Sequence, residues 1–184
     1  MKSEKKSEYK NAIKTAVASA TPDMSPEDRK KYESVIADVV EKGMTPAAAM
    51  GFGEVELESF YGMGFNMYNS GKFKEAKNVF SALCNFDNTK GKHWYGLAAC
   101  HHKLKEFEEA QIYYMSWSVL EPDNPIPYFH AADCSIHLNK QEEAIVFLTM
   151  AINRCKDIPE YQKIKEKAKS MQEKLREEVG KGKE

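Results

Sequence analysis

The chain has 184 residues, with 27 basic and 28 acidic side chains and a formal net charge of −1. This balance provides no electrostatic basis for binding nucleic acid or an anionic membrane surface. Hydrophobic residues make up 42% of the chain and charged residues 30%, which is typical of a globular protein with its own core. No apolar run approaches the roughly 20 residues of a membrane span, and no apolar stretch of a secretory signal follows the charged N-terminus. We therefore expect a cytoplasmic protein that does not insert into the membrane directly.

Residues 1–24 form a polar, lysine-rich N-terminal extension. Tyr9, Ile13 and Val17 lie on a weak helical stripe within it. The stripe is compatible with a loose amphipathic helix, and the composition is equally compatible with disorder.

Residues 25–56 are predicted to form an N-terminal helical segment. Ser25 is a suitable N-cap, Pro26 suits the first helical turn, and Asp28 follows the cap by three residues. An apolar stripe at helical spacing then runs through Tyr32, Val35, Ile36, Val39 and Val40, and Gly43 ends the helix. A short second helix is expected at 47–50, before the break at 51–53.

The most informative pattern is a repeat of 34 residues. Ala76, Ala110 and Ala144 are spaced by this interval. An aromatic residue stands 16 positions before each alanine (Phe60, Trp94, Tyr128), and a large apolar residue stands four positions after it (Phe80, Tyr114, Leu148). A small residue recurs at one further position (Gly64, Ala98, Ala132), where two helices must approach closely. This is the period of the tetratricopeptide repeat, a helix–turn–helix unit that stacks into a solenoid.

The predicted fold is therefore all-α, a solenoid of three repeats over 57–90, 91–124 and 125–158. The two aromatic and apolar sets of the register are expected to fill the core. Residues 159–184 form a capping helix and tail, because a stripe through Tyr161, Ile164, Ala168, Met171 and Leu175 would cover the open end of the last repeat.

The inner face of a tetratricopeptide solenoid is lined mainly by the first helix of each repeat. On the known pattern of this repeat family, the side chains that face the groove are expected to be Tyr61, Phe65, Tyr68, Tyr95, Ala99, His102, Phe129, Asp133 and Ile136. Most are aromatic or apolar, although separate residues already supply the core. Such a lining favours an extended peptide with apolar anchors.

The sequence contains no motif for catalysis, and we predict no enzyme activity and no cofactor. Four cysteines occur without a CxxC pair and are expected to be small buried residues. His130 and Cys134 are four residues apart but have no further ligand at regular spacing, so no metal site is predicted. His101 occupies a core position of the repeat and is expected to be packed and hydrogen-bonded.

A clamp for a C-terminal carboxylate, found in some tetratricopeptide co-chaperones, is not expected. The positions that would hold its basic pairs contain Phe65 with Asn69 and Asp133 with His137. Neither pair supplies the lysine or arginine that the clamp requires. A scaffold or assembly factor that binds another peptide partner remains an alternative function for the groove.

Several stretches are more specific than the repeat consensus. They are residues 71–76, 79–84, 95–100 and 127–134, the last reading Pro-Tyr-Phe-His-Ala-Ala-Asp-Cys. In these stretches the chain resembles the class II chaperones of bacterial type III secretion systems. The resemblance implies a chaperone of the bacterial cytoplasm that holds an extended segment of hydrophobic translocator proteins in its groove and keeps them soluble. It also implies a homodimer in the free state, formed through the N-terminal helices, with Tyr32, Val35, Ile36 and Val39 as the candidate contacts.

Overall fold

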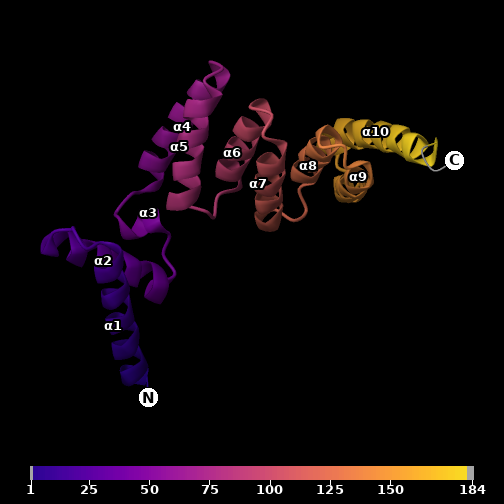
Figure 1. Ribbon diagram of the computed structural model, residues 1–184. Coiled ribbons are helices and arrows are strands. Elements are labelled where there is room, and N and C mark those ends of the chain that lie inside the picture. Colours follow the sequence, from indigo (N-terminus) through magenta and orange to yellow (C-terminus); the bar gives the residue numbers. More distant parts are fainter. Residues whose placement is uncertain (1, 182–184) are drawn as a thin grey trace. The chain divides into compact units, whose positions relative to one another are not determined.

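A computed structural model describes residues 2–181, which form ten α-helices and one 3₁₀ turn and contain no β-strand (Figure 1). The chain divides into two compact units. The first unit extends to residue 58 and includes residues 85–87; the second comprises residues 59–84 and the chain from residue 88 onward. The all-α class predicted from the sequence is thus confirmed. None of the helices within the described range is both long enough and apolar enough to cross a lipid bilayer.

The first unit contains α1 (Lys2–Ala20), α2 (Pro26–Lys42), α3 (Pro46–Ala49) and the start of α4 (Glu54–Asn69). The N-terminal extension is therefore helical over most of its length. The guanidinium of Arg29 on α2 donates hydrogen bonds to the carbonyl oxygens of Thr21, Pro22 and Met24, at 2.9 to 3.3 Å. These contacts satisfy carbonyl groups that follow the end of α1 and tie α2 to it.

The start and the end of α2 lie where the sequence signals predict them. The Ser25 hydroxyl accepts a hydrogen bond from the backbone N–H of Asp28 at 3.1 Å and donates one to the Asp28 carboxylate at 2.7 Å. Gly43 adopts a left-handed conformation with φ of 65° and terminates the helix. Both caps satisfy backbone groups that the helix itself leaves unpaired.

Replacing Ser25 with alanine is expected to destabilise the first turn of α2 by about 1 kcal/mol, because the Asp28 N–H loses its acceptor. Hydrogen exchange at the amides of residues 27–30 would measure the loss. The matched control is Ser34→Ala on the exposed face of the same helix, where alanine is the better helix former. Equal protection in the two variants would contradict the capping role.

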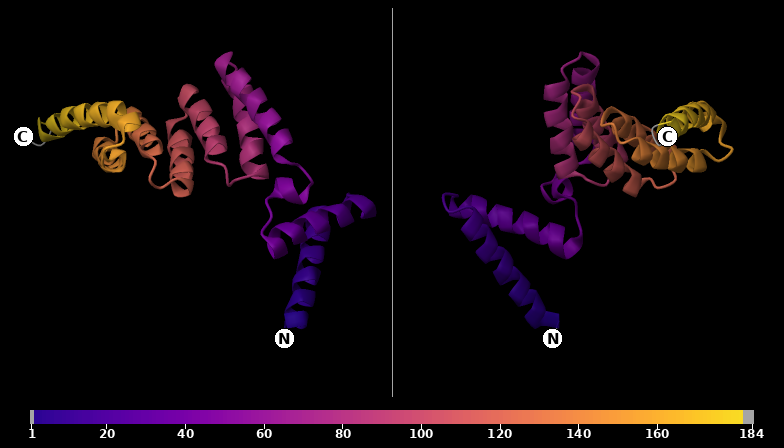
Figure 2. Two further views of the ribbon diagram at one scale, coloured as in Figure 1. Left: turned by 180° about the vertical axis from the view of Figure 1, so that it is seen from behind. Right: turned by 45° about the vertical axis from the view of Figure 1, so that its right-hand side comes forward.

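In the second unit, six helices form three antiparallel pairs, and successive helices lie side by side in chain order in all views (Figures 1 and 2). The pairs are α4 with α5 (Phe73–Phe86), α6 (Gly91–Lys103) with α7 (Phe107–Leu120), and α8 (Pro125–His137) with α9 (Gln141–Cys155). A 3₁₀ turn, η1 (Pro159–Tyr161), leads into α10 (Gln162–Lys181). These pairs are the three predicted repeats.

The 34-residue register also governs the turn inside each pair. The residue at the turn is left-handed in all three repeats: Gly71 with φ of 77°, Lys105 with 62° and Asn139 with 59°. The following N–H donates to the carbonyl five residues earlier at 2.9 Å in each case, as Lys72 to Met67, Glu106 to His101 and Lys140 to Ser135. This is the bonding of a Schellman motif. The lysine and the asparagine adopt the conformation for which the first repeat uses glycine.

The core follows the register closely. Ala76, Ala110 and Ala144 are fully buried, and the large residues four positions later (Phe80, Tyr114, Leu148) are at most 2% exposed. Ala98 and Ala132 are fully buried too, and Gly64 is buried with the Phe80 ring close to its α-carbon. Two apolar clusters occupy the spaces between α6, α7 and α8 and between α8, α9 and α10.

The expectation that Phe60 belongs to the core is wrong. Its side chain is 42% exposed, whereas Trp94 is half-buried and Tyr128 is 5% exposed. The register assigned Phe60 to the core by analogy with these two residues. Within the second unit, however, α4 is the first helix, so no preceding repeat packs against it as α5 packs against α6.

The last helix covers the open end of the solenoid, as predicted. On α10, Ala168 is fully buried and Leu175 is 6% exposed, and both pack in the cluster with Leu148. The Gln172 amide donates to the Thr149 hydroxyl of α9 at 2.7 Å. The apolar stripe thus removes from water the surface that a fourth repeat would otherwise bury.

Candidate peptide-binding surface

The predicted groove residues lie on the first helices of the three repeats, and we refer to them together as the first-helix row. It comprises Tyr61, Phe65 and Tyr68 on α4, Tyr95, Ala99 and His102 on α6, and Phe129, Asp133 and Ile136 on α8. Their spacing of three and four residues places the members from each helix on one face of that helix.

On α4, Tyr61 links the row to the next repeat. Its ring stacks on Phe65 with 6.4 Å between centroids, and it meets the buried Phe80 ring edge-on at 5.6 Å. It also lies 6.2 Å from the ring of His93 on α6, and the Lys92 ammonium is 4.8 Å from its centroid. Tyr61 is therefore held from several sides, while its neighbour Phe65 is 49% exposed.

The row continues from α6 to α8 and then to α10. Tyr95 lies 5.0 Å from Trp117 and 6.2 Å from His130 between ring centroids, and it remains 38% exposed. The Lys167 ammonium of α10 lies 5.3 Å from the centroid of Phe129. These contacts place aromatic surface from successive repeats side by side, where a single extended chain could touch it.

The members of the row differ in how much surface they offer to a partner. Tyr68, Phe129 and Ile136 are half-buried, and Ala99 is only 8% exposed. Burial raises the pKa of the Tyr68 hydroxyl, and the nearby Tyr95 and Cys100 raise it further. Tyr68 thus stays neutral, with a polar tip that can bond to a peptide backbone.

The polar part of the row centres on Asp133. Its carboxylate lies 3.0 Å from Nε2 of His102, and this bond holds the pKa of Asp133 below its usual range even though burial opposes the shift. Burial, with the neighbouring His102 and Lys167, lowers the pKa of His130 to about 4. His130 is therefore neutral near pH 7, whereas Asp133 is an anion. An anion at this position disfavours a bound C-terminal carboxylate, in agreement with the missing carboxylate clamp.

His101 is buried as expected for a core position, at 8% exposed. Its Nδ1 lies 2.7 Å from a carboxylate oxygen of Glu106, but the approach lacks the geometry of a hydrogen bond. Glu106 also accepts a hydrogen bond from the Lys77 ammonium at 2.9 Å. Burial and the nearby Lys77 lower the pKa of His101. The Lys77–Glu106 ion pair connects α5 to the turn between α6 and α7.

The sequence predicted no metal site at His130 and Cys134, and a more compact group of side chains was not considered. Within residues 11–181, whose side chains the structure describes, His102, Asp133 and His137 bring one ligand atom each to within 4.8 Å of one another. Asp133 and His137 are one turn apart on α8, which the sequence could have indicated. His102 comes from α6, and only the packing of α6 against α8 brings it to the other two.

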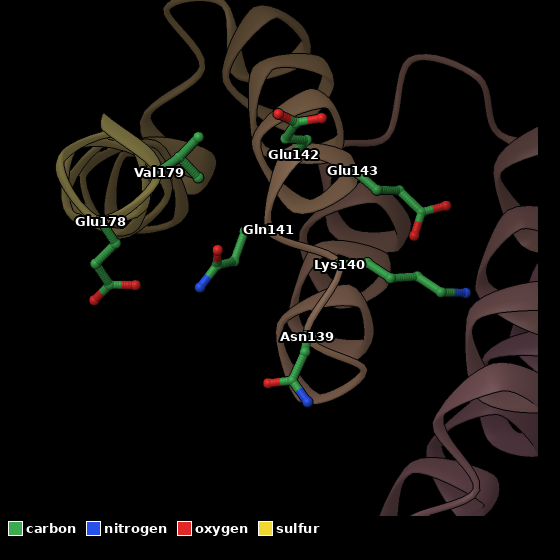
Figure 3. Close-up of a pocket in the computed structure, with 7 residues that line it drawn as sticks. All are labelled: Asn139, Lys140, Gln141, Glu142, Glu143, Glu178 and Val179. Carbon is green, nitrogen blue, oxygen red and sulfur yellow. The ribbon is translucent and has the colours of Figure 1, made fainter. Parts of the chain in front are cut away.

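Two further depressions lie away from the row. One, of about 650 Å³, lies between the start of α9 and the end of α10, where the carboxylates of Glu142, Glu143 and Glu178 point in different directions (Figure 3). The other, of about 600 Å³, follows the opposite face of α4 along Ser59, Met63, Asn66 and Ser70. Neither has groups that converge on a ligand.

The fold and the first-helix row define a tetratricopeptide-repeat protein with an aromatic surface suited to a peptide. No protein-family model matches the chain. The low calcium response locus protein H of Yersinia pseudotuberculosis is 30% identical to it over 154 residues, which cover 83% of this chain and 92% of that protein. The chaperone protein SicA of Salmonella typhimurium is 26% identical over 129 residues, which cover 70% of this chain and 78% of SicA.

Solved structures agree with these relatives. The type III secretion chaperone SycD of Yersinia enterocolitica, in complex with a peptide of the translocator YopD, is 30% identical with a TM-score of 0.67, and the match covers 69% of this chain and 97% of SycD. A chain from a type III secretion complex of Aeromonas hydrophila is also 30% identical, with a TM-score of 0.75. The match covers 79% of the chain described here and 97% of the Aeromonas chain. The chain described here belongs to the tetratricopeptide-repeat chaperones of type III secretion translocators.

Proposed function

We propose that this protein binds an extended segment of a hydrophobic translocator protein along the first-helix row, and that it keeps this client soluble in the bacterial cytoplasm before secretion. The observation that carries the proposal is the continuity of the aromatic row from α4 to α8, with Phe65 49% and Tyr95 38% exposed. The relatives support the client class, because SycD is known in complex with a YopD peptide and PcrH with the chaperone-binding region of PopD.

Binding of the client segment is driven by burial of apolar surface and needs no nucleotide hydrolysis. Each Å² of apolar surface removed from water contributes about 25 cal/mol before the cost of ordering the bound segment. Phe65 and Tyr95 present large rigid side chains that lose little rotamer freedom on binding. A client segment with apolar side chains spaced along an extended backbone would gain most from such a row.

The free protein is proposed to be a homodimer through α2. Tyr32 is 50% exposed, Val35, Ile36 and Val39 are half-buried, and no residue of α2 is fully buried. A helix whose apolar stripe stays partly open to water has surface available for a second copy. SycD supports this proposal because it has been crystallised as an alternative dimer.

The test is to replace Tyr61 and Phe65 together with alanine and to measure binding of a peptide from the N-terminal part of the cognate translocator. The dissociation constant is expected to rise at least about tenfold, because two neighbouring aromatic side chains of the row are lost. In co-expression, less of the client should remain soluble. Phe65→Ala alone should show part of this loss of affinity, and it leaves the contact between Tyr61 and the buried Phe80 ring in place.

The matched control is Ile112→Ala with Val119→Ala, two apolar residues of α7 that are 62% and 77% exposed and lie outside the row. This control should bind the peptide as the parent chain does. If the Tyr61 and Phe65 double variant also held the peptide with parental affinity while remaining folded by circular dichroism, the row would not be the binding surface.

A further inference from the structure

The cluster formed by His102, Asp133 and His137 has a geometry that the proposed client binding does not require. Nε2 of His102 lies 3.0 Å from Oδ2 of Asp133, and Nε2 of His137 lies 4.0 Å from the same oxygen. The three ligand atoms all fall within 4.8 Å of one another. The side chains of His102 and Asp133 are 21% and 35% exposed, so water and ions can reach them.

Two imidazoles and one carboxylate are a ligand set that suits zinc and neighbouring divalent cations. Zinc takes histidine nitrogen at about 2.0 Å and carboxylate oxygen at about 2.1 Å, which places neighbouring ligand atoms of a tetrahedral site roughly 3.3 Å apart. The His102–Asp133 separation is already close to this value. Nε2 of His137 is 4.0 Å from the Asp133 oxygen and must move closer to it by less than about 1 Å, which a side-chain rotation can provide.

The surroundings hold two of the ligands in orientation. Nδ1 of His102, the nitrogen turned away from Asp133, lies 3.4 Å from the hydroxyl of Tyr114, which is 1% exposed. Metal-bound histidines usually have such a partner on the second nitrogen, which sets the tautomer and the ring orientation. The ring of His137 stacks on Phe107 at 4.2 Å between centroids and 6° between planes.

We propose that His102, Asp133 and His137 bind one divalent cation of the zinc class, with the fourth coordination position open to water. The site joins α6 to α8 across the junction of the second and third repeats. It does not depend on the identity of the client, although two of its three ligands belong to the first-helix row. Cysteine thiolates are not needed as ligands, and the four thiols are buried.

The experiment uses the full chain without a histidine tag, treated with a chelator and then dialysed. Titration with Zn²⁺ by calorimetry is expected to give one equivalent per chain. Co²⁺ as a spectroscopic probe should give visible d–d bands of a nitrogen and oxygen site. His137→Gln and Asp133→Asn should each raise the dissociation constant at least about tenfold. Because the His137 side chain is half exposed, its replacement should leave the fold intact.

His130→Gln is the matched control, since His130 is a histidine of the same helix whose ring lies 6.4 Å from that of His102 without belonging to the ligand set. It should bind Zn²⁺ as the parent chain does. The proposal is overturned if the parent chain shows no saturable binding up to millimolar Zn²⁺, or if His137→Gln binds with parental affinity. A cobalt spectrum dominated by sulfur-to-metal charge transfer would also overturn it, because the ligands would then be cysteines.

Discussion

Replacing Gly96 with valine is expected to lower the free energy of unfolding by about 3 kcal/mol, at the upper end of the usual cost of overpacking a core. A Cβ atom on Gly96 would lie 2.5 Å from Cδ1 and Cε1 of Phe80. Phe80 cannot easily withdraw, because it is 2% exposed and meets the Tyr61 ring edge-on. For a chain of this size the melting temperature should fall by about 6–12 °C, measured by circular dichroism.

Gly62 provides the matched control because it occupies the same repeat position 34 residues earlier. A Cβ added there meets no atom within 4 Å. Gly62→Val should therefore change the free energy of unfolding by less than about 0.5 kcal/mol. Phe80→Leu should recover part of the loss in the Gly96→Val chain, because the smaller side chain makes room. A Gly96→Val protein that melts with the parent chain would show that α5 and α6 do not pack as described.

The four cysteine thiols are expected to react with Ellman's reagent at least about a thousandfold more slowly in the native protein than in the unfolded chain. Burial raises the pKa of Cys84, Cys100 and Cys134 to about 12 and raises that of Cys155 as well. At pH 8 the reactive thiolate of Cys84, Cys100 and Cys134 is then roughly a thousandfold rarer than that of an ordinary cysteine. All four side chains are at most 5% exposed, which also keeps the reagent out.

The measurement follows the absorbance of the released thiolate at pH 8, first in buffer and then in guanidinium chloride. Four equivalents should appear promptly in the denaturant, and the slow native reaction should report transient opening of the helices. The unfolded chain is thus its own control. A thiol that reacts rapidly in the native protein would mean that the helix pair around it is open to solvent.

The periodic part of the fold could be predicted because helix pairing within a repeat is local. The alanine, large apolar and small positions recur every 34 residues. The side chains at these positions pack mainly against the helix that comes directly before or after their own in the chain. The turn inside the first repeat was predictable as well, because Gly71 marks the left-handed residue. Asn139 is a weaker signal of the same kind, because asparagine tolerates the left-handed conformation, whereas Lys105 adopts it without any such signal.

The residues of the candidate site remain a prediction from the repeat register, and their arrangement in space could not be predicted. The register identified which side chains of α4, α6 and α8 share a face, yet it could not show that Phe65 would be half exposed while Ala99 is buried. It also placed Phe60 in the core, although an end position of a repeat array lacks the neighbour that an inner position has. The His102–Asp133–His137 cluster was missed because its members come from two helices and have no shared spacing.

The residue pattern was enough to predict the all-α class, the number of repeats, the capping helix and the faces that each helix presents, because a helix converts spacing along the chain directly into direction in space. Which of these faces pack against one another depends on the folded arrangement of the helices. Contact between repeats depends on the volumes of side chains from different helices, such as Phe80 against the bare backbone of Gly96 or His130 against Tyr114. Close packing between helices therefore determines which side chains of the periodic pattern lie together on the surface. Both the first-helix row and the proposed metal site depend on this packing.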